Sequence, residues 1–339
     1  MAHILFTAMN AVLPIILVIV LGYCLRRGGF LSGDFLKQGN KLVFKVCLPC
    51  MLFINVYDIE SFSATRWDIV TYCVAMTVLL FLLGLGTAVV TTKIPQRRGV
   101  ILQCTFRSNF AIIGLSLAGA LGGEEAQAVA AVVSAFAIPV FNILGVVSLS
   151  VFTGHVSGKD SVRQILKNVL KNPLILGVAL GLGCLLIRLL QVELFGEVVF
   201  ALNRQGKFLY TAVSYLKAIA SPFALLVMGG QFEFSAVKGM LREIVVGTVW
   251  RTVLAPVLGL GIAAVLTKYT GRIEFGVNDY PAMIALFGSP VAVSSAIMAE
   301  QMENDGQLAT QLVVWTSLCS IVTIFLLVCV LMAAGLLAV

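Results

Sequence analysis

Charge is scarce in this chain. Only 12% of its 339 residues are Asp, Glu, Lys or Arg, about half the share of roughly 25% that soluble domains carry. Apolar residues make up 60%, and the mean hydropathy is +1.03. A soluble fold needs a charged exterior, so this composition excludes a soluble enzyme, a disordered chain, a coiled coil and a nucleic-acid-binding protein. We therefore expect the lipid bilayer to surround most of the chain.

Histidine is rare, and acidic residues are absent from the centres of the apolar runs. The two histidines, His3 and His155, lie near the amino end and in a loop, and neither has a neighbouring metal ligand. A membrane-embedded hydrolase or transferase would need a nucleophile with its base, or a metal. We therefore expect no enzyme, no metal site and no cofactor. No Asp or Glu lies at the centre of an apolar run, which argues against a cation pump, since its relay needs buried carboxylates.

The apolar residues form ten runs of roughly membrane-spanning length, about 20 residues each. These runs cover residues 4–25, 40–57, 67–92, 99–121, 125–152, 173–190, 209–230, 243–267, 280–299 and 307–337. Between the fifth and sixth, residues 153–172 place apolar side chains at helical spacing among charged ones. This pattern predicts an amphipathic helix on the cytoplasmic membrane surface.

Basic residues in the loops predict the orientation. The loops after the odd-numbered runs hold thirteen Lys and Arg, against six on the opposite side. Because cytoplasmic loops are enriched in Lys and Arg, the odd-numbered loops are expected in the cytoplasm. The chain is thus predicted to be a multi-pass protein of the cell membrane with both termini extracytoplasmic.

The two halves of the chain resemble each other. Residues 13–22 are similar to residues 172–181, Pro49 of the second run corresponds to Pro222 of the seventh, and polar breaks occur in the fourth and ninth runs. We therefore expect one five-helix repeat over 1–152, a linker over 153–172 and a second repeat over 173–339. Five is odd, so the second repeat would be inverted, as in many secondary transporters with alternating access.

The fourth run carries Arg107, Ser108 and Asn109 near its middle. A central Arg costs roughly 2.5–3.5 kcal/mol on insertion scales, so it should face a wet cavity or a partner. A purely structural pairing is the alternative. An interior with fixed cations and no fixed anions favours an anionic substrate. Polar side chains within other apolar runs, Asn55 and Asn142, join these candidate binding residues.

The ninth run contains Gly288, Ser289 and Pro290. Proline lacks an N–H and disrupts the helix around it. If the helix breaks here, the amino end of its second half would favour a carboxylate; a simple proline kink is the alternative. Ser289 and Pro290 are therefore further candidate binding residues, and Gly288 is a candidate hinge.

Two segments resemble the auxin efflux carrier family, which includes bacterial malate and malonate carriers and plant PIN-type carriers. They are FRSNFAIIGL at residues 106–115 and SPVAVSSAIMAEQ at residues 289–301. The resemblance implies an all-α membrane fold of ten helices in two inverted repeats, related to bile-acid symporters and sodium–proton antiporters. Interrupted helices 4 and 9 would cross at mid-membrane and bind the carboxylate of the substrate.

The resemblance also assigns roles to single residues. Asn109 and Pro290 would mark the crossover, and Pro49 and Pro222 would bend the neighbouring helices. Many relatives have a proline a few residues after the asparagine, where this chain has Gly114-Leu-Ser116. The interruption of helix 4 would then run through Asn109 and Gly114.

The predicted function is secondary transport of a small organic anion, a mono- or dicarboxylate such as malate, malonate or an auxin-like acid, by an elevator mechanism of alternating access. A ligand sensor with the same fold but little transport is the alternative. The sequence leaves open the substrate, the direction and the coupling ion, H⁺ or Na⁺. It also leaves a homodimer open, because the small residues Gly177 and Gly181 allow close helix packing within or between subunits.

Overall fold

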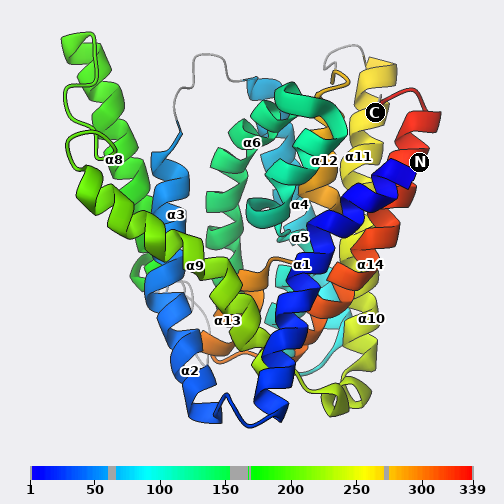
Figure 1. The fold of residues 1–339 in the computed structure, drawn as a ribbon. Helices are drawn as coiled ribbons and strands as arrows, with labels where there is room; N and C mark the ends of the chain where they lie inside the picture. The colour runs from blue at the N-terminus through cyan, green and yellow to red at the C-terminus, as the bar shows by residue number, and fades with distance from the viewer. Residues whose placement is uncertain (1, 60–65, 153–166, 168, 271–274, 338–339) are drawn as a thin grey trace.

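The computed structural model describes residues 2–59, 66–152, 167, 169–270 and 275–337 (Figure 1). Over these residues the chain is helical, with one isolated antiparallel bridge. The α-helices are α1 (Ala2–Arg27), α2 (Gly33–Leu42), α3 (Leu48–Tyr57), α4 (Trp67–Thr91), α5 (Pro95–Phe106), α6 (Leu115–Val151), α8 (Pro173–Phe195), α9 (Lys207–Gln231), α10 (Leu241–Val249), α11 (Ala255–Val265), α12 (Asp279–Gly288), α13 (Val293–Gln301) and α14 (Gly306–Ala333). Short π-helical segments are η1 (Val43–Cys47), η2 (Phe110–Gly114), η4 (Trp250–Leu254) and η5 (Leu266–Thr270), and η3 (Phe234–Gly239) is a 3₁₀ helix.

Local sequence signals set several helix ends. Side-chain oxygens of Ser32, Asn172 and Asp305 accept hydrogen bonds from backbone N–H groups in the first turns of α2, α8 and α14. Each of them satisfies a donor that the helix itself leaves unpaired. Gly196 ends α8 with φ +76°, a conformation that glycine adopts without a steric penalty.

Prolines explain two of the π-helical segments. Pro49 follows η1 and Pro256 follows η4, each in the first turn of the next α-helix. Because proline cannot donate to the carbonyl four residues earlier, the preceding turn widens. Pro222 lies inside α9. The hinge roles expected for Pro49 and Pro222 stay predictions.

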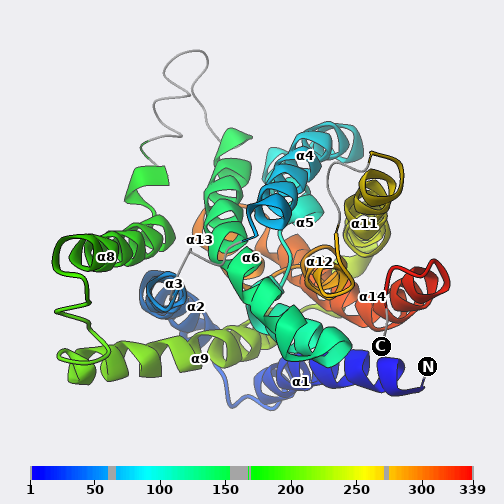
Figure 2. The same cartoon turned by 90° about the horizontal axis from the view of Figure 1, so that it is seen from above.

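The helices form two groups (Figures 1 and 2). One group contains α2, α3, α8 and α9, which pack on one another. The other contains α4, α5, α10, α11, α12 and α14, and α6 and α13 run between the groups. α1 packs against both α9 and α14. Its amino end and the carboxyl end of α14 lie at the same end of the molecule (Figure 1).

Among the residues that the structure describes, seven helices are long and apolar enough to span a membrane. The ten spans and the inverted repeats expected from the sequence are not confirmed by this count. One reason is that the fourth and ninth runs are broken: α5 has 12 residues, α12 has 10 and α13 has 9, each too short to span alone.

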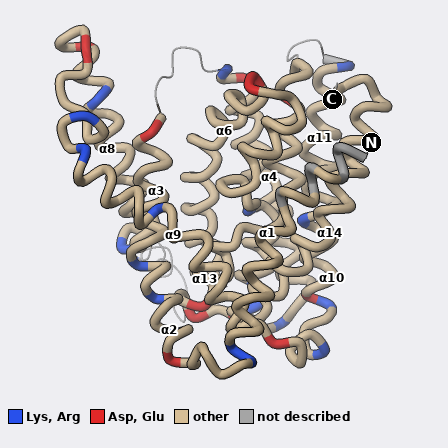
Figure 3. Tube along the Cα trace, in the orientation of Figure 1, with Lys and Arg blue, Asp and Glu red and all other residues tan. Residues whose placement is uncertain are grey.

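Charged residues gather at the two ends of the helix bundle and along α8 and α9, and the middle is largely uncharged (Figure 3). This distribution is typical of a multi-pass membrane protein. Most of the linker predicted over residues 153–172 lies outside the described residues, so its helical character and its cytoplasmic location stay predictions. The division of the chain into repeats at residues 152 and 173 likewise stays a prediction.

Candidate substrate-binding site

The two interrupted helices cross at their breaks. α5 ends at Phe106, and the chain resumes as η2 at Phe110; α12 ends at Gly288, and α13 begins at Val293. The two non-helical segments run antiparallel, with Ser108 paired to Val291. The Asn109 N–H donates to the Pro290 carbonyl at 2.7 Å, and the Ala292 N–H donates to the Arg107 carbonyl at 3.4 Å. The breaks expected at Ser108–Asn109 and Ser289–Pro290 are present.

Gly114 explains how the first break forms without a proline. A Cβ on Gly114 would lie 2.1 Å from Cδ2 of Phe110, so only glycine lets the Phe110 ring fold back over the π-helical turn. Gly288, the second expected hinge glycine, is the last residue of α12.

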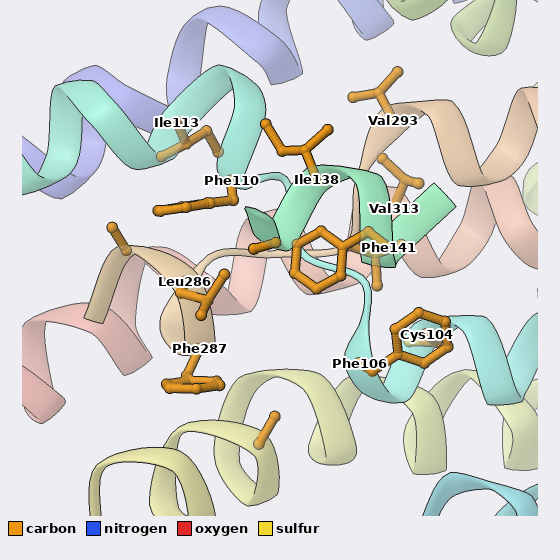
Figure 4. Packing of buried hydrophobic residues seen from close by; sticks show 14 of the residues in the cluster. Cys104, Phe106, Phe110, Ile113, Ile138, Phe141, Leu286, Phe287, Val293 and Val313 are labelled. Atoms are coloured by element: carbon orange, nitrogen blue, oxygen red, sulfur yellow. The ribbon is translucent and has the colours of Figure 1, made fainter. Parts of the chain in front are cut away.

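Aromatic side chains enclose the crossing (Figure 4). Phe106 and Phe110 flank the first break, Phe287 precedes the second, and Phe141 of α6 lies beside them. All four are at most 3% exposed, and the Phe106 and Phe141 ring centroids are 6.4 Å apart. Such close packing fixes the position of the two extended segments.

Arg107 is 3% exposed, and its side chain points across the crossing to α6 and α13. Its guanidinium donates to Asn142 Oδ1 and to Ser294 Oγ, both at 2.9 Å, and contacts the sulfur of Met298. These partners are all uncharged. Gly145 leaves room for the group, because a Cβ there would lie 2.9 Å from Nη1 of Arg107.

A small cavity of about 40 Å³, which we call the crossover cavity, opens beside Arg107. Its polar lining comes from Arg107, Ser108, Asn109, Asn142, Ser221 and Ser294, and its apolar lining includes Leu48, Met51, Leu52 and Ala224 of α3 and α9. None of the described residues that line it is a carboxylate. Ser108 Oγ and Asn109 Nδ2 are buried and form no hydrogen bond to any part of the chain that the structure describes.

Helix amino ends also face this cavity. Val293 and Ser294, in the first turn of α13, and Ala111 of η2 are among its lining residues. Backbone N–H groups in a first helical turn lack intrahelical partners and carry partial positive charge. Together with Arg107 they make the cavity electropositive.

Asn55 lies in a second cavity. This larger space, about 540 Å³, is lined by Asn55, Asp58 and Lys217 among others, and it shares Ala111 and Ile138 with the crossover cavity. Lys217, a cation at mid-run in the sequence, pairs with Asp58 at 3.5 Å. Asn55 is therefore close to the candidate site but apart from Arg107.

Ser289 and Pro290 belong to the crossing but face away from the cavity. The Ser289 hydroxyl donates to the Ala285 carbonyl at 2.6 Å, and its own carbonyl accepts from Nε of Arg251 at 3.0 Å. Residues 292–294 line the cavity in their place. Ser294 and Ser221 are not among the binding residues expected from the sequence. Ser294 had a usable signal, since it lies in the first turn after a predicted break.

Arg251 is a second buried arginine beside the crossing, 1% exposed. Besides the Ser289 carbonyl, its guanidinium donates to the carbonyls of Leu286, at 3.2 Å, and Phe287. These are the last carbonyls of α12, which the interrupted helix leaves without partners. Arg251 thus caps the carboxyl end of α12.

Comparison with known proteins agrees with this architecture. Residues 7–328 match the family described as membrane transport protein. An uncharacterized transporter of Methanocaldococcus jannaschii is 24% identical over 255 residues, which cover 73% of this chain and 76% of the relative. An uncharacterized transporter of Methanothermobacter thermautotrophicus is 21% identical over 327 residues, covering 93% and 95%. The family match spans nearly the whole chain and confirms the resemblance drawn from the sequence: this protein belongs to the membrane transport protein family, the auxin efflux carrier family.

Proposed function

We propose that this protein is a secondary transporter of a small organic anion whose carboxylate binds in the crossover cavity. The observation that carries the proposal is Arg107, a buried cation with only uncharged partners in the described part of the chain. A buried charge without a counter-charge is costly, and an anion placed beside it offsets that cost.

The donors around the cavity fit a carboxylate. A carboxylate has two oxygens that accept about four hydrogen bonds. Arg107 supplies charge-assisted donors, and the cavity-lining Ser108 Oγ and Asn109 Nδ2 have no hydrogen-bond partner among the described residues. The apolar side chains from α3 and α9 would cover the rest of the molecule. A monocarboxylate with an apolar body, such as an auxin-like acid, matches this division directly, whereas the second carboxylate of malate or malonate would have to reach the helix amino ends that line the cavity.

Binding requires the cavity to enlarge. A volume of about 40 Å³ holds only about three waters at 10–15 Å³ each. Helices α6 and α13, which continue the chain after the two breaks, run between the two helix groups (Figure 2), so movement of one group relative to the other would open the site. Movement of the crossover against α3 and α9 is our proposed route to alternating access.

Counterflow in proteoliposomes tests the proposal. Vesicles loaded with unlabelled L-malate, malonate or indole-3-acetate should accumulate the same labelled anion transiently, and protein-free vesicles should not. Arg107→Gln should reduce this accumulation at low substrate concentration. Binding without counterflow for every anion would instead identify a ligand sensor, and neither binding nor counterflow would refute a carboxylate site.

A further inference from the structure

A separate polar cavity of about 390 Å³ lies at the other end of α13. Its lining includes Lys37 of α2, Gln231 at the end of α9, Glu300 of α13 and Gln307 of α14. It therefore lies where the helix that starts at the crossover reaches helices of both groups.

Helix α13 contributes one acidic residue, Glu300, to this cavity. Its carboxylate accepts hydrogen bonds from Gln231 Nε2 at 2.9 Å and from Asn40 Nδ2. Both donors are neutral amides, and in the described part of the chain Glu300 forms no ion pair within 4.0 Å. Burial raises the pKa of the Glu300 carboxyl, against smaller opposing effects of these two hydrogen bonds and of Lys37.

Other charged groups surround the cavity or belong to elements that pack on α13. Arg26 of α1, Lys37 of α2 and Glu233 after α9 line the cavity. Helices α2, η1 and α5, which pack on α13, add exposed Asp34 and Lys41 of α2, exposed Lys45 of η1, and Arg97 and Arg98 of α5, of which Arg97 pairs with Glu243 and Asp305; exposed Glu303 follows α13.

Unpartnered acceptors accompany the carboxylate. Asn40 is 0% exposed, and its Oδ1 has no hydrogen-bond partner among the described residues; the same is true of the buried Gln307 Oε1. A protonated carboxyl carries one additional O–H donor. The Asn40 amide contacts Glu300 and can turn over to accept from it, so the surroundings of Glu300 suit the protonated as well as the ionised form.

Helix α13 joins this site to the crossover. Ser294, in its first turn, accepts from Arg107, and Glu300 follows six residues later, about 9 Å along a helix axis. We propose that Glu300 binds a proton together with the anion at Arg107, so that the protein carries an organic anion and a proton as a pair. The inference rests on the proposed function for its anion and on Glu300 for its proton.

Electrostatics gives the size of the coupling. An ionised Glu300 repels an anion held by Arg107. At an effective dielectric constant of about 20 and the axial distance of about 9 Å, this repulsion weakens anion binding on the order of tenfold. Protonation removes it, and by linkage a bound anion raises the proton affinity of Glu300 by the same factor.

The first test uses no substrate. Thermal melting of the purified protein across pH compares wild type with Glu300→Gln, a neutral isostere, and with Glu303→Gln as the matched exposed control. A raised pKa in the folded state means that ionised Glu300 opposes folding at high pH and ceases to do so as pH falls through that pKa. Glu300→Gln should therefore melt higher than wild type at high pH, with the difference vanishing at low pH, and Glu303→Gln should follow wild type. A difference independent of pH would overturn proton binding at Glu300.

The second test measures coupling. L-malate binding to wild type should tighten about tenfold as pH falls through the Glu300 pKa, in a range where malate itself stays ionised, and should draw a proton from weakly buffered solution. Glu300→Gln should bind tightly at all pH values without proton uptake. If malate binding to wild type is independent of pH, the coupling is refuted but the anion site is not. If malate does not bind at all, the anion site is contradicted, and the melting experiment alone tests proton binding at Glu300. Malate binding that depends on Na⁺ and loses this dependence in Glu300→Gln would refute the proton in favour of a metal ion.

Discussion

Arg107 and Arg251 are both buried beside the same crossing, and they differ in what their guanidinium groups contact. Arg251 donates to the carbonyls of Leu286, Phe287 and Ser289 at the carboxyl end of α12. Arg107 donates to the side chains of Asn142 and Ser294 and lines a cavity. Burial of a charge in a membrane protein is therefore not by itself a sign of a binding site. The hydrogen-bond partners distinguish the two roles. Backbone carbonyls accept the hydrogen bonds of Arg251, whereas the partners of Arg107 in the described part of the chain are uncharged side chains and its charge lies beside a cavity.

The largest expected effect comes from removing Arg251. Arg251→Met leaves three buried carbonyls without donors, and one such group costs about 1–3 kcal/mol. We expect a stability loss of roughly 3 kcal/mol or more, seen as a fall in melting temperature on the order of 5 °C or more.

Arg251→Lys is the control for this change. It should recover part of the loss, since the charge survives but the planar set of donors does not. A melting temperature unchanged in Arg251→Met would contradict the capping role and remove the contrast with Arg107.

The sequence could predict the crossing but not the division of labour between the two arginines. Paired polar breaks at residues 107–109 and 288–290 located both interruptions, because proline and buried polar residues disturb a helix locally. The partners of Arg251 depend on how η4 packs against α12, which no local pattern in either segment encodes. The ion pair of Lys217 is likewise not encoded locally, because Lys217 lies in α9 and its partner Asp58 follows α3, far away in the sequence.

Side-chain direction was also beyond the sequence. Ser289 and Ser294 both flank the second break, yet Ser289 faces α12 and Ser294 faces Arg107. The rotation of a short helix about its axis decides this, and tertiary packing sets that rotation. The ten spans expected from the sequence are not confirmed for a related reason, since a half-helix such as α13, with 9 residues, is too short to span a membrane alone.

Arg107→Gln should show the opposite behaviour to Arg251→Met. An opposite charge in a partly wet cavity is worth on the order of 1–4 kcal/mol, so carboxylate binding should weaken roughly tenfold or more. The melting temperature should change less than in Arg251→Met, because Asn142 and Ser294 are neutral and can hydrogen-bond to the new amide or to water. Binding assays by calorimetry or thermal shift with L-malate measure both quantities.

Arg107→Lys separates charge from geometry in this experiment. It should retain part of the affinity, since the charge stays and the planar fork is lost. If Arg107→Gln binds carboxylates like wild type and loses only stability, then Arg107 is a structural residue like Arg251.

Asn142→Asp sharpens the comparison without touching either arginine. Its Oδ1 is 2.9 Å from the Arg107 guanidinium, so a carboxylate of the same shape would neutralise that charge internally. We expect L-malate binding to weaken by a factor of several up to about ten, because the substrate would compete with a covalently held anion. The melting temperature should change little, since the buried cation gains a counter-charge while the hydrogen bond that Asn142 Nδ2 donates to the Ile138 carbonyl at 2.8 Å is lost. Unchanged malate affinity in Asn142→Asp would show that the net charge at Arg107 does not matter to the substrate.

The smallest expected effect compares one serine from each side of the second break. Ser294→Ala removes one of the hydrogen-bond acceptors that position Arg107, and one hydrogen bond contributes about 0.5–1.5 kcal/mol. We expect L-malate affinity to fall about threefold, because the guanidinium keeps Asn142 but can tilt. Ser289→Ala is the matched control: among the described residues its hydroxyl hydrogen-bonds only to the Ala285 carbonyl in the preceding turn of α12, so affinity should stay at the wild-type value. Equal losses in the two variants would mean that the crossing responds as one packed unit, and the functional distinction between its two faces would have to be abandoned.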